Sequence, residues 1–238
     1  MTVFSRFLGV LFLAVAAMGT TLSQSMTQGT LKFAVTDVKT DAPEMQQMIG
    51  GMKGMSQVIE FDGQKQKMTM EMMGGLMKIK TYWSSSTKSM ETYMDMMGQK
   101  IKTLMSMEEM EKMQGEEASG VKSSDIVYDK SARKEILGLD CYKASFVTEA
   151  NGQKLSMEMY VTEDIKVPNS FVQNLNQVEL KGTPLMWIMD AGMMKMTFQA
   201  TEVSKDLASD FFEKPEGDYQ QLSMEQLKQM GMGGQLGF

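Results

Sequence analysis

Apolar and polar residues alternate along most of this chain, and methionine fills many of the apolar positions. Met68, Met70 and Met72, for example, alternate with Thr69 and Glu71. Side chains two residues apart lie on the same face of a β-strand. The alternation therefore predicts strands that have one thioether-rich face and one polar face. The strands expected from it are 29–38, 58–61, 67–72, 76–83, 89–96, 100–105, 126–128, 134–137, 142–148, 155–162, 184–190 and 194–203.

Short turn sequences separate many of these strands. Asp62-Gly63, Gly74-Gly75, Asn151-Gly152 and Ala191-Gly192 each stand between two of them, and such pairs favour tight hairpins. Neighbouring strands joined in this way run antiparallel. We therefore predict a mainly β chain of the α+β class: a curved antiparallel sheet or open half-barrel with two or three short helices.

The short helices are expected where the apolar period changes from two to between three and four. Ser106 with Glu109, and Ser223 with Gln226, have the spacing of a capping box that opens a helix. The expected helical segments are 106–113 and 223–230, with one helical turn at 169–175 and a loop or short helix at 41–55.

The first 25 residues have the pattern of a secretory signal peptide. Arg6 precedes an unbroken apolar run from Phe7 to Ala17, and small residues follow it. We expect one β-rich domain over 26–230, with its halves joined near 114–124, and a flexible Gly- and Met-containing tail at 231–238. Because no later apolar run reaches about 18 residues, the mature chain is not expected to have a transmembrane helix. This predicts an exported protein of the bacterial periplasm or cell envelope.

Charge and composition exclude several kinds of chemistry. Removing Arg6 with the signal peptide takes the formal charge from −6 to −7, which disfavours binding to nucleic acid. The chain has no histidine, so it lacks the commonest general base and the commonest zinc ligand. Glu71 and Glu158 alternate with methionines and are expected on solvated strand faces. We therefore expect no enzyme, no catalytic residues and no cofactor.

A single cysteine, Cys141, allows no intrachain disulfide. It is expected to be a small buried apolar residue. A reactive thiol or an intermolecular bridge is the alternative.

The methionines are the candidate site. Of the 30 in the chain, 17 lie between Met45 and Met113. A core with one well-ordered packing favours Leu, Ile and Val, whereas methionine suits surfaces that repack around apolar partners. The candidate lining of an apolar cleft is Met68, Met70, Met72, Met77, Met94, Met96, Met105, Met157, Met159, Met194 and Met196.

The second half also resembles a family of exported bacterial proteins, domain of unknown function 4412. Segments 136–143, 160–168 and 182–185 are similar to its I-x-G-x-x-C-x-K, strand-and-proline and G-x-P-L motifs, and 212–219 to its closing F-x-x-P-x-G-Y. In the last motif Asp218 is an insertion. The resemblance spans about 31–230 and implies no catalytic residues.

More distantly, the layout looks like that of the LolA/LolB-type lipoprotein carriers, whose open half-barrels hold acyl chains beneath short helices. Arg6 and Arg133 are the only arginines, so no inner-face arginine of those carriers can be carried over.

The sequence thus predicts non-enzymatic binding of an apolar ligand, such as a lipid, an acyl chain or a hydrophobic segment, on a concave methionine face. One alternative is a methionine-based Cu(I)-binding protein, because thioether sulfur is a soft ligand. In that case sulfurs must come from neighbouring strands. The other alternative is a structural interaction domain whose methionines are packed core. The oligomeric state is left open.

Overall fold

A computed structural model describes residues 25–43, 46–106, 108–109, 122, 125–150, 153–169, 171–172 and 179–229. The expected signal peptide, the tail and nearly all of the 114–124 connection lie outside these ranges. So do most of the helical segments expected at 106–113 and 169–175, and the Asn151-Gly152 turn.

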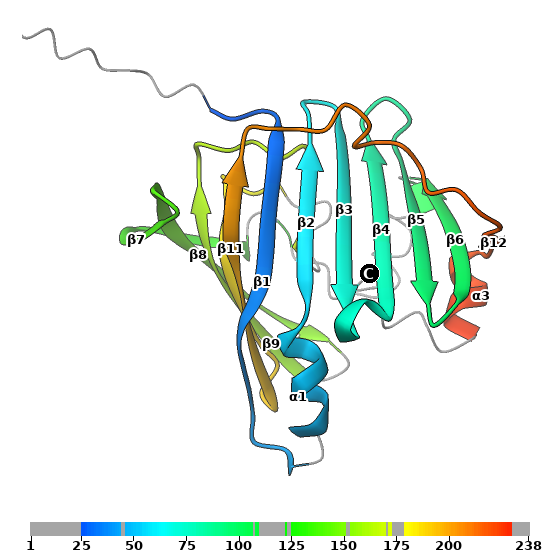
Figure 1. Ribbon diagram of the computed structural model, residues 1–238. Coiled ribbons are helices and arrows are strands. Elements are labelled where there is room, and N and C mark those ends of the chain that lie inside the picture. The colour runs from blue at the N-terminus through cyan, green and yellow to red at the C-terminus, as the bar shows by residue number, and fades with distance from the viewer. Residues whose placement is uncertain are drawn as a thin grey trace, which may run out of the picture.

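Twelve strands form one open, curved sheet (Figure 1). The strands are β1 (Gly29–Thr40), β2 (Ser56–Phe61), β3 (Lys65–Met72), β4 (Met77–Ser84), β5 (Ser89–Met96), β6 (Gln99–Ser106), β7 (Val127–Ile136), β8 (Leu139–Ala150), β9 (Gln153–Thr162), β10 (Thr183–Asp190), β11 (Met194–Ser204) and β12 (Gln220–Gln221). Their order across the sheet is β12-β6-β5-β4-β3-β2-β1-β11-β10-β9-β8-β7. All neighbours are antiparallel except β12, which runs parallel to β6. The predicted fold class is therefore confirmed.

Strand β1 joins the two halves of the chain. It pairs with β2 on one side and with β11 on the other, so that Leu31 lies opposite both Ile59 and Val203. Two meanders, one from each half, thereby become a single sheet. The hydrophobic faces of both halves then belong to one continuous surface.

The edges of the sheet differ from the sequence prediction. The segments 126–128 and 134–137, expected as two strands, fall in the single strand β7 (Val127–Ile136) except for residues 126 and 137. Its pairing with β8 shifts register between Asp129 and Arg133, where the Asp129 carboxylate accepts hydrogen bonds from the Ser131 and Ala132 amides. This bulge interrupts the apolar alternation that the prediction relied on. The two-residue strand β12 was not predicted.

The short helices are α1 (Gln46–Lys53), η2 (Met73–Gly75) and α3 (Met224–Gln229). Both predicted capping boxes form. The Ser223 amide donates to Gln226 Oε1 at 2.8 Å and the Gln226 amide donates to Ser223 Oγ at 3.2 Å. Ser106 and Glu109 make the same reciprocal pair. Helix α1 lies within the segment that was expected as a loop or short helix.

The sheet has an inner face, which carries Leu31, Phe33 and Ile59 at 0–1% exposure, and an opposite outer face. Over β4–β6 the segment 205–219 crosses the outer face. There Tyr82 donates a hydrogen bond to the Glu213 carbonyl at 2.9 Å, and Lys214 pairs with Glu91 at 3.2 Å. The outer face of this half of the sheet is therefore covered, at least in part, by a segment from the end of the chain.

Candidate ligand-binding face

All eleven methionines of the predicted site project from the inner face. In an antiparallel sheet, residues directly opposite each other on neighbouring strands share a face. Met70 lies opposite Gln57 on one side and Ile79 on the other, and Ile79 lies opposite Met94. Following such pairs across the sheet connects each candidate methionine to Leu31 and Phe33. The eleven methionines therefore share one face of the sheet, as the alternation of apolar and polar residues predicted.

Burial divides the eleven into two groups. Five are enclosed: Met94 at 0% exposure, Met105 at 3%, Met157 at 1%, Met159 at 0% and Met196 at 6%. Six are half-buried: Met68, Met70, Met72, Met77, Met96 and Met194. A role for any of them in lining a ligand cleft stays a prediction. The half-buried group is the part of the face that a guest could reach with the least rearrangement.

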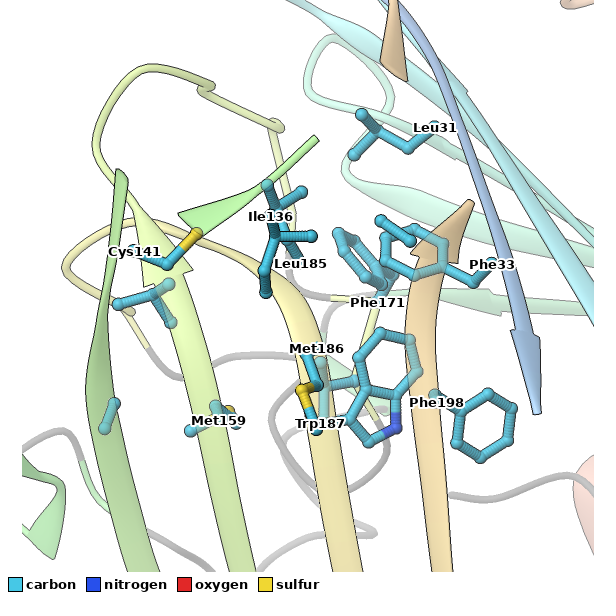
Figure 2. Packing of buried hydrophobic residues seen from close by; sticks show 14 of the residues in the cluster. Leu31, Phe33, Ile136, Cys141, Met159, Phe171, Leu185, Met186, Trp187 and Phe198 are labelled. Atoms are coloured by element: carbon cyan, nitrogen blue, oxygen red, sulfur yellow. The ribbon is translucent and has the colours of Figure 1, made fainter. Parts of the chain in front are cut away.

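One part of the inner face is a tightly packed aromatic cluster, which we define as Phe33, Phe171, Trp187 and Phe198 (Figure 2). The Trp187 ring stacks on Phe198 with centroids 4.9 Å apart and lies 5.0 Å from the Phe33 ring. Met159 lies directly opposite Trp187 in the sheet. Large rings in such contacts favour one arrangement, so this region resembles a rigid core more than an adaptable cleft.

A strap between β9 and β10 closes over the aromatic cluster. We define the strap by its described residues 163–169 and 171–172. The Asn169 amide donates to Gln66 Oε1 on β3 at 3.1 Å, and Gln57 on β2 donates to the Phe171 carbonyl at 3.4 Å. The strap thus crosses from β9 to strands of the other half of the chain.

Gln57 and Gln66 were missed by the sequence analysis. Their side chains are 1% and 5% exposed on the inner face, and they satisfy backbone groups of the strap. Gln66 shares the even numbering of Met68, Met70 and Met72, so its place on that face was readable from the period. Its partner in the strap was not.

The other part of the inner face is built on β3–β6, and we call it the methionine patch: Met70, Met72, Met77, Met94 and Met96, with Ile79 and Ile101. Leu222 and Leu227, both buried, pack on it together with Met224. Leu227 and Met224 belong to α3. Among the described residues, the patch is therefore covered by the helix α3 and by Leu222, which precedes that helix.

A row of threonines borders the patch. Thr81, Thr92 and Thr103 lie opposite one another on β4, β5 and β6 and are 8%, 1% and 1% exposed. The Thr81 and Thr92 hydroxyls are 3.3 Å apart and hydrogen-bonded. The apolar patch therefore ends at a polar row and continues only toward the end of the sheet where Met72, Met77 and Met96 lie.

Cys141 is buried, and its thiol is poorly reactive. It is 0% exposed on β8, and its thiol donates to the Leu139 carbonyl at 3.6 Å. Burial raises the pKa of this thiol to about 11, which keeps it protonated at neutral pH. This favours the interpretation of Cys141 as a packing residue.

Ionic groups gather on the outer face. Burial would raise the pKa of Glu91, but hydrogen bonds from Lys214 and Tyr93 hold it below its ordinary value. Burial raises the pKa of Tyr82 to about 12. In the described ranges, no group of three His, Cys, Asp or Glu side chains could hold a metal ion. None of the helices there has the length and hydropathy that a membrane crossing requires.

No family model matches this chain. The resemblance to domain of unknown function 4412 therefore has no support from that comparison. None of the curated proteins matches it either.

Among solved structures, the chain is similar to the lipoprotein LppX of Mycobacterium tuberculosis, with a TM-score of 0.38 and 6% identity over 77% of this chain and 90% of LppX. It is also similar to LprF of Mycobacterium bovis, with a TM-score of 0.34 and 10% identity over 82% of this chain and 95% of LprF. Similarities at this level carry no conclusion about what this chain binds.

Proposed function

We propose that this protein binds an apolar chain, such as the acyl chain of a lipid or a hydrophobic peptide segment, on its methionine patch. Binding involves no bond making or breaking. The observation that carries the proposal is the combination of half-buried methionines on one face with a cover that, among the described residues, consists of α3 and Leu222. The signal-like N-terminal sequence makes the bacterial envelope the proposed place of action.

The methionine patch is a better host than the aromatic cluster. Methionine side chains are unbranched, have three rotatable bonds and adapt to guests of different shape. The aromatic cluster is already filled by stacked rings, and the hydrogen bonds from Gln57 and Gln66 hold the strap over it. Within the described part of the chain, a guest on the patch has to displace α3 and Leu222.

The free energy gained by burying a guest can exceed the free energy lost when the cover is displaced. Burying a leucine side chain is worth about 1.5–3 kcal/mol, so Leu222 and Leu227 together hold the cover with about 3–6 kcal/mol. A helix of six residues has little stability of its own in water. Each buried methylene of a guest contributes about 0.8 kcal/mol. About four to eight methylenes therefore compensate for the lost contacts, and ordinary acyl chains are longer than that.

The proposal is tested with a fluorescent polyene fatty acid as the probe. We expect saturable binding to the mature chain, and weaker binding to Met70→Gln, which puts an amide into the patch. The matched control is Met97→Gln, because Met97 is 82% exposed on a turn and should leave probe binding unchanged. Leu227→Ala should tighten binding, because the cover that competes with the guest is weakened.

Native mass spectrometry of the protein purified from an envelope fraction supplies a second readout. A co-purifying lipid of defined mass supports the proposal. If the protein carries no lipid and the probe does not bind the natural chain or Leu227→Ala, the proposal is wrong, and the methionines are packed core.

A further inference from the structure

Three methionines lie in one line across three neighbouring strands at an end of the sheet. Met72 on β3 is directly opposite Met77 on β4, and Met77 is directly opposite Met96 on β5. All three side chains are half-buried. We call this set the methionine row. Figure 1 shows that the end of β3, the start of β4 and the end of β5 meet at the same end of the sheet.

The spacing of the row allows its sulfurs to converge. Neighbouring strands are about 4.8 Å apart, and directly opposite side chains have Cβ atoms about 5 Å apart on a shared face. Rotation about the side-chain bonds moves each thioether sulfur toward its neighbour. Met224 of α3 and Met70 pack against the same hydrophobic cluster as the row.

Two further methionines stand outside the row at its open side. Met73 follows Met72 and is 54% exposed, and Met97 follows Met96 and is 82% exposed. The Met97 amide donates to the Leu76 carbonyl at 3.1 Å, which holds the β5–β6 turn against the β3–β4 turn. Met73 and Met97 have φ of 53° and 52°, a left-handed conformation that is uncommon for a bulky side chain. Met73 and Met97 are thus the exposed sequence neighbours of the two outer residues of the row.

We infer that the methionine row is a binding site for a soft monovalent cation, Cu(I). Thioether sulfur is neutral and soft, and it selects Cu(I) over hard oxygen-seeking cations. Met73 and Met97 would serve as exposed first contacts for the ion. This site shares Met72, Met77 and Met96 with the methionine patch, but it requires their sulfur atoms, whereas the proposed apolar ligand requires their apolar area.

A second line of methionines shows what sets the first apart. Met196, Met189 and Met157 lie directly opposite one another on β11, β10 and β9. Met157 is only 1% exposed and Met196 only 6%, whereas Met189 between them is half-buried. An ion therefore has access to one thioether of this line and not to three. The line has the same ladder geometry as the row and provides a matched control.

The test is a titration of the mature chain with Cu(I) in oxygen-free buffer against a chromogenic Cu(I) chelator. We expect one Cu(I) per chain with sulfur-only coordination by X-ray absorption. The variant Met72→Leu/Met77→Leu/Met96→Leu should lower the affinity for Cu(I) by more than about tenfold. Replacing residues that only support the ligands of a metal site already causes a loss of about that size. The control Met157→Leu/Met189→Leu/Met196→Leu should bind as the natural chain does.

Leucine is close to methionine in volume, so circular dichroism is expected to show folded protein for both variants. The single variant Met77→Leu, which removes only the central sulfur, tests the same point if the triple variant fails to fold. Absence of competition with the chelator by the natural chain, or equal loss in both triple variants, would overturn the inference. So would loss of binding in Cys141→Ala, which would assign the ion to the thiol.

The two ligands are titrated separately into the natural chain, which separates this inference from the proposed function. Probe binding without Cu(I) binding by the natural chain refutes only the metal site. Cu(I) binding without probe binding refutes only the apolar ligand.

Discussion

The replacement Leu227→Ala tests how firmly α3 covers the methionine patch. The Leu227 side chain is 0% exposed and packs against residues of β4, β5 and β6. Replacing a buried leucine by alanine costs about 2–5 kcal/mol, depending on how well the site collapses. Because α3 lies at the margin of the sheet, we use the lower end of that range. About 2 kcal/mol corresponds to an opening equilibrium about 30-fold more favourable.

Hydrogen exchange followed by mass spectrometry or NMR measures this opening directly. The Leu227 amide donates to the Ser223 carbonyl at 3.1 Å, and the Gln226 amide donates to Ser223 Oγ. Both amides should exchange about 30-fold faster in Leu227→Ala, whereas amides of β1, in the middle of the sheet, should not change.

The matched control is Met224→Leu, which alters the same helix at a half-buried position and nearly conserves volume. It should leave the exchange of α3 almost unchanged. Unaltered exchange in Leu227→Ala would refute the reasoning that this side chain holds the cover. Acceleration of the β1 amides by the same factor would refute the view that α3 opens on its own.

Three further outcomes are expected. Trp187→Ala should destabilise the protein by about 3–5 kcal/mol in urea denaturation, because the ring is 4% exposed and stacked on Phe198; a loss below about 1 kcal/mol would contradict a rigid aromatic cluster. Glu91→Gln should lower the melting temperature at pH 7, because the ion pair with Lys214 stabilises the fold above the lowered pKa of Glu91. The difference in melting temperature between the natural chain and the variant should disappear as the pH falls through that pKa. A difference that grows in acid would refute the stabilising role of this ion pair. Cys141 should react with Ellman's reagent only after unfolding, since burial raises its thiol pKa to about 11; rapid reaction of the folded protein would show an accessible thiol.

The methionine row shows which features of the candidate site could be predicted from the sequence. Alternation along each strand was enough to assign Met72, Met77 and Met96 to inward-facing positions, because strand geometry forces successive side chains to opposite faces. It did not reveal that the three lie in register. Register depends on the turns between the strands, and here η2 (Met73–Gly75) between β3 and β4 and the turn at 85–88 between β4 and β5 set it.

The covers of the sheet were less accessible to prediction. The capping box at Ser223 predicted a helix correctly, since its hydrogen bonds are local. Nothing local indicated that the helix would lie on β4–β6 after the chain had crossed the outer face. The strap likewise depends on Gln57 and Gln66, which are separated from their partners by more than 100 residues.

The sequence by itself determined most of the strands and hairpins, the capped helix that begins after Ser223 and the face on which each candidate methionine lies. These features follow from the sterics and hydrogen bonds of residues close together in the chain. Only the tertiary structure decided that β1 joins the two halves, that Met157 and Met159 are fully buried, and that Met70, Met72, Met77 and Met96 stay half-buried. The physical reason is that burial depends on which distant segments pack together, and a period of two describes only the direction in which a side chain leaves its own strand.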